Sequence, residues 1–232
     1  MGTISIEHGD RLFWLGRYTE RVFTTLKVLE KYYDKMIDEN PQFYVEYLNS
    51  FGLSDIYGSS DKFLKSFLYE KENPNSIANS LERAYDNGIV LREEISTDAL
   101  SFIQMAMDTL ENTKDSSRGL ILNLLPLEDI LFGFWGCIDD YILDEEIKTI
   151  IYCGKCVERL DLYLRLGYDF KAAEAEFARL CKYLARVPKN TPYRYNTKQL
   201  SVLVEALGTP EDYRMGKSDA ISALGRLFEK LK

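Results

Sequence analysis

Apolar residues recur at alternating spacings of three and four positions between residues 12 and 36. This spacing places them on one face of an α-helix and continues for more than three heptads. Phe13 and Trp14 lie off that face, so the first half of the helix is apolar on most sides, which is typical of a buried helix. The pattern predicts a helix with Asp10 as its N-cap and an end near Asp38. The residues on the face are Leu12, Leu15, Thr19, Val22, Leu26, Leu29, Tyr33 and Met36.

Helical periodicity continues along the rest of the chain, and no segment shows a competing strand pattern. Turn residues separate the periodic segments. We therefore predict an all-α fold, an antiparallel bundle of about seven to nine helices, with residues 1–232 in one domain. Further helices are predicted over residues 43–48, 61–70, 74–95, 99–112, 127–139, 144–166, 171–186, 197–207 and 218–231, with a helix start within residues 119–125.

A Glu-Arg dipeptide occurs three times, each time on a predicted helix and each time one turn after a small residue. Adjacent residues on a helix point about 100° apart, so the Glu and the Arg of one dipeptide cannot satisfy each other. An unpaired buried charge is costly, so each needs a partner on another helix. We expect three long helices that meet in the interior. The three copies are Gly16, Arg17, Glu20 and Arg21; Ala78, Asn79, Glu82 and Arg83; and Gly154, Lys155, Glu158 and Arg159.

Two of the small residues are glycines, and a glycine inside a helix costs about 1 kcal/mol relative to alanine. Close approach of two helices is the simplest compensation for that cost. We therefore expect the helices of the first and third copies to touch. The predicted close-approach positions are Gly16, Ala78 and Gly154, and the predicted ion pairs are Glu20 with Arg159 and Glu158 with Arg21.

The charges of the three copies have two interpretations, and both stay open. One is an interhelical salt-bridge network that fixes the register of the helices. The other is a pocket for a carboxylate or a phosphate, because arginine suits planar, bidentate recognition of such groups. In the second interpretation the pocket is lined by Arg17, Arg21, Arg83, Lys155 and Arg159.

The sequence offers little for a self-sufficient enzyme. His8 is the only histidine, which disfavours Ser-His catalysis and excludes paired Glu-x-x-His di-iron motifs. No phosphate-binding loop, dinucleotide fingerprint or nucleophile elbow is present. Cys153 and Cys156 have the spacing of a redox or metal motif, but aligned on the Glu-Arg copies they match Leu15 and Tyr18, which are core positions. We expect no metal and no cofactor.

Charge and hydropathy narrow the class of partner. The chain has 29 Lys and Arg against 37 Asp and Glu, a net charge of −8, which argues against a general nucleic-acid binder. No apolar run is long enough to span a membrane, and no basic region followed by an apolar one begins the sequence. We expect a cytoplasmic protein without membrane contacts, and the pattern does not predict an oligomeric state.

The three Glu-Arg segments resemble those of the alpha-E family, helical domains named for their Glu-Arg motifs. The resemblance spans residues 5–166, and we expect residues 167–232 to form C-terminal helices that pack on this part. Lys155 and Cys156 replace an Arg and a Tyr that are usual in the family, Tyr85 and Ile89 replace Arg, and Leu100 replaces a frequent Trp. The matching segments are Phe13–Arg21, Asn73–Ile77 with Ala84, Asn87, Arg92, Ile95 and Ser96, and Cys153–Arg159.

The resemblance implies a working context, since members of the family tend to accompany ATP-grasp peptide-ligase-like proteins and transglutaminase-like proteases. Three functions follow as hypotheses. The first is a non-catalytic accessory protein that acts with an ATP-grasp-type ligase and holds an anionic peptide or product. The second is an amide-forming or amide-cleaving enzyme in which the arginines bind a substrate carboxylate and a Glu acts as general base. The third is a structural protein that forms oligomers.

Overall fold

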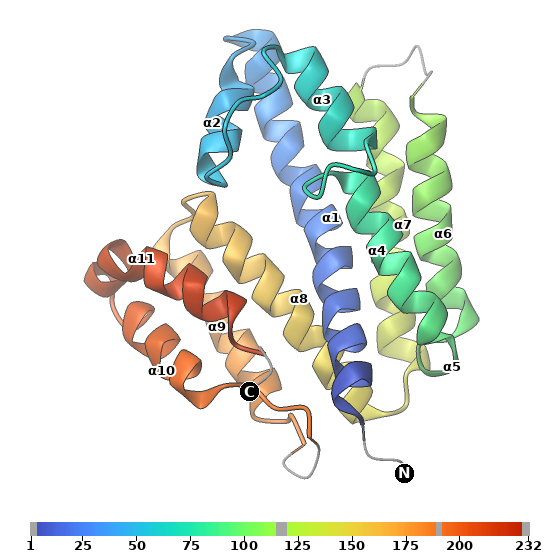
Figure 1. Cartoon of the computed structure of the whole chain (residues 1–232), viewed down its shortest axis with the longest axis vertical. Coiled ribbons are helices and arrows are strands. Elements are labelled where there is room, and N and C mark those ends of the chain that lie inside the picture. The colour runs from blue at the N-terminus through green and yellow to red at the C-terminus, as the bar shows by residue number, and fades with distance from the viewer. Residues whose placement is uncertain (1–3, 115–119, 189–191, 229–232) are drawn as a thin grey trace.

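The computed structural model describes residues 4–114, 120–188 and 192–228, and within these ranges every regular element is a helix (Figure 1). The predicted all-α fold is therefore confirmed. The eleven helices of the described ranges are α1 (Ile6–Asp38), α2 (Phe43–Ser50), α3 (Ser60–Tyr69), α4 (Ile77–Val90), α5 (Arg92–Ile95), α6 (Thr97–Asn112), α7 (Leu120–Tyr141), α8 (Glu145–Arg165), α9 (Phe170–Leu184), α10 (Thr197–Ala206) and α11 (Pro210–Gly225).

Helix α1 is the longest element and runs through the middle of the molecule, with α4 packed on one side and α8 on the other (Figure 1). It begins earlier than predicted, because Ser5 rather than Asp10 is the N-cap and its hydroxyl accepts a hydrogen bond from the backbone N–H of His8 at 3.1 Å. Its end at Asp38 agrees with the prediction. The early start adds a turn whose side chains line a groove described below.

Two buried apolar clusters are arranged along α1. The N-terminal half of α1 packs with α5, with α8 to α11, and with the C-terminal ends of α4 and α7 and the N-terminal end of α6. The C-terminal half of α1 packs with α2, α3, and the ends of α4, α6 and α7 that adjoin them. Leu15 belongs to the first cluster and Val22 to the second, while the buried charges Arg17 and Glu20 fall between these two residues. The charged layer therefore sits where the two cores meet.

The predicted antiparallel arrangement does not hold for the central pair of helices. Gly16 of α1 lies beside Gly154 of α8 at the crossing point, and the next charged residues of both helices, Glu20 and Arg159, also meet. Contacts that advance together along both chains require the two helices to run in the same direction, as Figure 1 also shows. Helix α7 accounts for this direction, because it carries the chain back to the end of the bundle where α1 begins. Helix α8 then starts from that same end (Figure 1).

Some helix boundaries differ from the predictions. The helix predicted over residues 74–95 is interrupted at Leu91, so α4 has only 14 residues and is not one of the longest helices. The last helix runs over Pro210–Gly225 rather than residues 218–231, because Thr209 caps it and Pro210 starts it. The end of the predicted segment, residues 229–231, and part of the loop before α7 lie outside the described residues.

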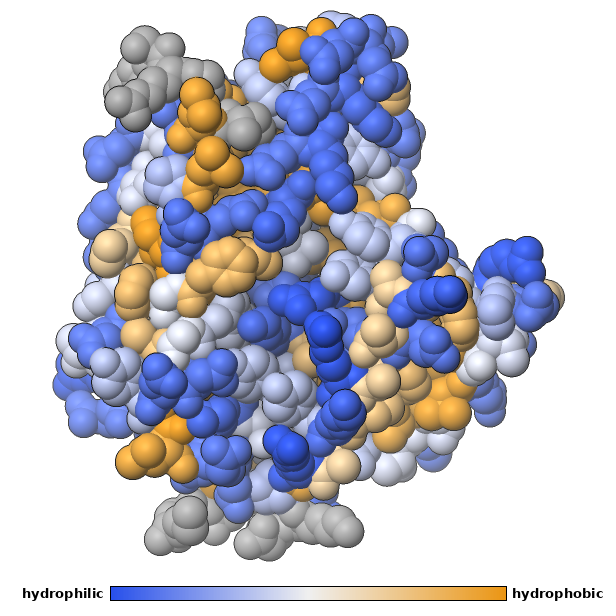
Figure 2. Space-filling view, turned by 180° about the vertical axis from the view of Figure 1, so that it is seen from behind, coloured by the Kyte–Doolittle hydropathy of each residue, from blue (hydrophilic) through white to orange (hydrophobic). Residues whose placement is uncertain are grey.

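Much of the outer side of the bundle is hydrophilic, with separate hydrophobic patches (Figure 2). Three of the exposed apolar side chains, Leu122, Leu125 and Phe132, project from α7 and are 45–65% exposed. Helix α7 is therefore covered mainly on its inner side, by α6 and α1. Among the described helices, none combines the length and the hydropathy that crossing a membrane would require.

Candidate functional site

The crossing of α1 and α8 depends on two glycines. A Cβ placed on Gly16 would overlap the carbonyl oxygen of Ile151, and one on Gly154 would overlap the carbonyl oxygen of Phe13. The two backbones are in direct contact, as expected from the sequence. This contact explains why two helix interiors accept glycine, and it brings the charged residues of both helices into range of each other.

Two buried ion-pair clusters follow one turn after the glycines. Glu158 is 1% exposed and accepts two hydrogen bonds, from Arg17 Nε at 2.6 Å and from Arg21 Nε at 2.6 Å. Glu20 is fully buried and accepts from Arg159 Nε at 2.7 Å and from the Thr24 hydroxyl at 2.8 Å, both through Oε1. The structure therefore contains both ion pairs predicted between the first and third copies.

The two clusters are related by an approximate local two-fold symmetry, since each Glu of one copy meets the Arg of the other. The symmetry is incomplete, because Thr24 bonds to Glu20 alone and because α1 has Arg17 where α8 has Lys155. Arg17 donates to Glu158, whereas the Nζ of Lys155 lies over the ring of Trp135, 3.7 Å from its centroid. Among the described residues, Oε2 of Glu20 has no hydrogen-bond partner. Lys155 therefore does not give Glu20 the second hydrogen bond that Arg17 gives Glu158.

The two glutamates differ in their acid–base behaviour. Burial alone would raise the pKa of Glu158, but Arg17 and Arg21 together lower it to about 2. Burial raises the pKa of Glu20, and Arg159 with Lys155 offsets only part of this effect. Burial also lowers the pKa of Lys155 to about 8, against the opposing attraction of Glu20. Glu158 is therefore ionised at neutral pH. At Glu20 the neighbouring positive charges offset only part of the effect of burial.

A cavity of about 280 Å³ adjoins the Glu158 cluster. Arg17 and Arg21 of α1 line it together with Arg165 of α8, whose Nε donates to Asp161 at 2.8 Å. All three guanidinium groups are held through Nε, and their terminal Nη atoms make no hydrogen bond to any part of the chain that the structure describes. These N–H groups therefore remain available to a ligand in the cavity.

The composition of the cavity wall favours an anionic ligand. Three arginines face two carboxylates, Glu158 and Asp161, which leaves an excess of one positive charge. Burial raises the pKa of Asp161, which further reduces the negative charge of the cavity wall. The rest of the wall is mostly apolar and comes from α2, α3, α8, α11 and the loop after α2. Its larger apolar side chains are Tyr47, Phe51, Leu53, Phe67, Leu162 and Ile221.

The comparison with known families agrees with the Glu-Arg pattern. A family model described as Alpha-E, a predicted α-helical domain with a conserved ER motif, matches residues 8–224. The chain belongs to the Alpha-E family. The match includes the C-terminal helices α9 to α11 as well as the segments that carry the Glu-Arg copies. No curated protein and no solved structure gives a match.

The second ER copy of this Alpha-E domain does not join the other two, which corrects the prediction of three copies in one network. Glu82 lies at the surface and pairs with Lys71 at 3.1 Å, while Arg83 donates to the side chain of Asn79 on its own helix at 2.9 Å. Helix α4 packs on the face of α1 away from α8, and it buries Leu81, Ala84 and Gly88 instead. Residues 79, 82 and 83 therefore form no hydrogen bond or ion pair with the described charged residues of the α1–α8 contact.

The prediction for Ala78 is also wrong. Ala78 is only half-buried and lines a surface pocket between α4 and α6 with Leu81 and Met107. The small residues that α4 does bury are Ser80, Ala84 and Gly88, so the close approach uses a different face of the helix. One residue type at one position cannot define which face of a short helix packs.

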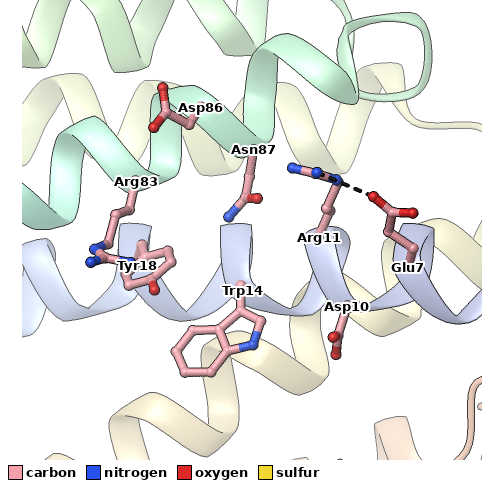
Figure 3. Close-up of a pocket in the computed structure, with 8 residues that line it drawn as sticks. All are labelled: Glu7, Asp10, Arg11, Trp14, Tyr18, Arg83, Asp86 and Asn87. Atoms are coloured by element: carbon pink, nitrogen blue, oxygen red, sulfur yellow. Dashed lines mark hydrogen bonds and ion pairs between the residues drawn. The ribbon is translucent and has the colours of Figure 1, made fainter.

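Arg83 instead lines an open groove between α1 and α4, shown in Figure 3, of about 390 Å³. Arg83 and Asn87 reach from α4 toward α1, and the Arg83 guanidinium lies 5.9 Å from the Tyr18 ring centroid, whereas Asp86 points away. Glu7 of the early first turn of α1 pairs with Arg11 at 3.3 Å. Three acidic residues outnumber two arginines in this groove, so it does not suit an anion. The acidic residues are Glu7, Asp10 and Asp86.

Sequence reasoning missed two charged residues of the Alpha-E cavity. Asp161 and Arg165 follow Glu158 at intervals of three and seven positions, so all three share one face of α8. That spacing could have identified them from the sequence. The apolar wall contributed by Tyr47, Phe51 and Phe67 had no such signal, since it depends on how α2 and α3 fold back onto α1.

The cysteines of the Cys-x-x-Cys segment occupy core positions, as their alignment with Leu15 and Tyr18 indicated. Cys153 and Cys156 are buried, and burial raises the pKa of both thiols. Cys156 lies near Glu176, whose carboxylate adds to this effect. A raised thiol pKa is the opposite of what a redox nucleophile or a metal ligand requires.

Proposed function

We propose that this Alpha-E protein is a non-catalytic accessory protein that holds an anionic peptide or product for an ATP-grasp-type peptide ligase. The observation that carries the proposal is the cavity beside Glu158, where Arg17, Arg21 and Arg165 present free Nη donors and one excess positive charge. Guanidinium groups fixed in position by other carboxylates recognise an incoming anion with little loss of side-chain entropy.

The two ER glutamates at the α1–α8 contact favour binding over catalysis. An amide-forming or amide-cleaving enzyme of the kind considered above needs a Glu with a raised pKa in the cavity. Glu158 is the glutamate that lines this cavity, and its two arginine partners lower its pKa to about 2. Glu20 has a raised pKa, but it is fully buried and does not line the cavity. Neither Glu20 nor Glu158 therefore supplies a general base of this type.

The ligase as partner rests on what the resemblance to the Alpha-E family implies rather than on any feature of the fold. That resemblance implies an ATP-grasp peptide-ligase-like partner, with a transglutaminase-like protease as the second partner class. The proposal therefore needs a test in which the partner and the cavity are varied separately.

The test is affinity capture from the native cell, followed by peptide-ligase assays with ATP and candidate peptides. We expect no activity from the chain alone and a ligase activity in the captured fraction that the purified wild-type chain stimulates. Arg165→Gln should abolish the stimulation, while Arg179→Gln should preserve it, because Arg179 forms a comparable intrahelical ion pair on α9 outside the cavity.

Two results would overturn the accessory role. One is turnover by the chain alone that is lost in Glu158→Gln while the fold is retained. The other is equal stimulation of the ligase by the wild-type chain and by Arg165→Gln, since the cavity would then have no part in the activity.

A further inference from the structure

We propose, building on the anion-binding function above, that the cavity binds the carboxyl-terminal end of a peptide whose last residue has an apolar side chain. The cavity is the space of about 280 Å³ lined by Arg17, Arg21 and Arg165. This volume lies just below the usual range of ligand pockets, which is roughly 300–1,000 Å³. It therefore suits one terminal residue, with the rest of the peptide outside.

The charge of the cavity selects a monoanion. Two of the three arginine charges are matched by Glu158 and Asp161, and one positive charge remains. One carboxylate neutralises that charge, whereas a phosphate dianion would leave a surplus negative charge next to the buried carboxylate of Glu158. Repulsion of that kind is strong beside a carboxylate that is only 1% exposed.

The arginines are positioned before a ligand arrives. Arg17 is held by Glu158 at 2.6 Å on one side and lies over the ring of Trp14, 4.7 Å from its centroid, on the other. Its side chain is 10% exposed, so the guanidinium is nearly buried and fixed in orientation. A planar guanidinium fixed in this way presents two parallel N–H groups, which matches the two oxygens of a carboxylate.

The opposite wall provides an apolar surface for the side chain of the terminal residue. Tyr47, Phe51 and Phe67 form an aromatic cluster, with Tyr47 centroids 4.9 Å from Phe51 and 5.2 Å from Phe67. Leu53 and Ile221 extend this surface. A terminal residue with an aliphatic or aromatic side chain buries apolar area there, which a free phosphate or acetate cannot do.

A third group fits the backbone of the peptide. Asp161 donates no hydrogen bond when ionised and accepts one from Arg165 through Oδ2 at 2.8 Å, and its Oδ1 has no partner in the described ranges. Oδ1 is thus an acceptor for the amide N–H of the terminal residue. The same oxygen would also accept from the ammonium group of a free amino acid, so the experiment includes both ligands.

The experiment is isothermal titration of the full chain with five probes. These are N-acetyl-L-phenylalanine, its uncharged amide, N-acetylglycine, free L-phenylalanine and inorganic phosphate. We expect N-acetyl-L-phenylalanine to bind one site per chain at least tenfold more tightly than each of the other four. Arg165→Gln should weaken this binding at least tenfold, and the matched variant Arg179→Gln should leave it unchanged.

A second variant tests the apolar wall and guards against a misfolded Arg165→Gln chain. Phe51→Ala is expected to remove most of the preference for N-acetyl-L-phenylalanine over N-acetylglycine, because Phe51 is half-buried, lines the cavity and packs against Tyr47. An unchanged preference in Phe51→Ala, with the native melting temperature retained, would overturn the role of the apolar wall.

The outcomes separate this proposal from the function on which it rests. Tighter binding of phosphate than of any carboxylate would overturn the peptide-terminus proposal but leave an anion-binding accessory role in place. Tighter binding of free phenylalanine would replace the peptide by an amino acid as the ligand. Equal binding of the acid and its amide, with no effect of Arg165→Gln on ligase stimulation, would overturn both proposals.

Discussion

Gly16 of α1 lies directly against the carbonyl oxygen of Ile151 in α8, and a methyl group at this position would overlap that oxygen. Gly154 has the same relationship with the carbonyl oxygen of Phe13. Because the atom in the way is backbone in both cases, the two helices would have to separate. Separation would lengthen the ion pairs of Glu20 and Glu158, which lie one turn further along.

We therefore expect Gly16→Ala and Gly154→Ala to destabilise the protein by about 2 kcal/mol or more, although alanine favours a helix. Gly136 is the matched control, because it lies inside α7 and a Cβ there meets no atom within 4 Å. Gly136→Ala should stabilise the protein by up to about 1 kcal/mol. Urea denaturation measures all three, and a Gly16→Ala chain as stable as Gly136→Ala would contradict the close contact.

Reversal of charge at Arg21 should destabilise strongly. Arg21→Glu would place a second carboxylate against the buried Glu158 and remove one of its two partners, which we expect to cost about 3–5 kcal/mol. Arg159→Glu should have a similar effect through Glu20. Arg83→Glu is the control from the second ER copy, since Arg83 is exposed and its hydrogen bond, to Asn79, lies within its own helix. We expect that change to cost less than about 0.5 kcal/mol, and equal melting temperatures for Arg21→Glu and Arg83→Glu would contradict a buried pair.

The contrast between these arginines also shows where sequence reasoning succeeded and where it failed. The partners of Glu20 and Glu158 were predictable, because both lie on long helices that also carry a glycine needing an explanation. The surface position of Glu82 was not predictable from its dipeptide. Helix α4 is short and half-exposed, and its apolar face, which does not include Glu82, is the side that packs. The cavity next to Arg21 was partly predictable from the spacing of Asp161 and Arg165 on α8. Its aromatic wall depends on the tertiary placement of α2 and α3, which no local pattern encodes.

Arg17 and Lys155 occupy matching positions in the first and third ER copies. Replacing each one by the other residue type should change the stability in opposite directions. Lys155→Arg would supply Oε2 of Glu20 with the donor that it lacks, by analogy with Arg17 and Glu158. We expect a gain of about 1 kcal/mol, because a buried carboxylate oxygen would become hydrogen-bonded. Arg17→Lys should lose about 1–3 kcal/mol by leaving Oε2 of Glu158 unpaired. Thermal unfolding of both variants checks the prediction, and a loss of stability in Lys155→Arg would show that the site cannot admit a guanidinium.

The four thiols should stay reduced and differ in reactivity. Burial raises the pKa of all four thiols, but Cys137, Cys153 and Cys156 are at most 8% exposed whereas Cys181 is half-buried. We expect a thiol reagent to label Cys181 first in the native chain and all four after unfolding. Rapid native labelling of Cys153 or Cys156, or one zinc per chain by elemental analysis, would contradict their assignment to the core.

The last prediction concerns pH and follows from Lys155. Burial lowers the pKa of this amine from 10.5 to about 8 in the folded protein. When the pH lies between these two pKa values, the unfolded chain binds more protons than the folded chain. The contribution of Lys155 to the free energy of unfolding therefore rises as the pH increases. Lys155→Met removes that contribution. The tyrosines also titrate at high pH, but they are the same in both proteins, so their effect cancels in the comparison. From pH 8 to pH 10 we therefore expect the wild-type chain to gain roughly 1–2 kcal/mol relative to Lys155→Met. Urea denaturation of both chains at pH 7, 8, 9 and 10 measures the difference. A difference that stays constant over this range would mean that Lys155 keeps its ordinary pKa, and the amine would then have to be reached by water.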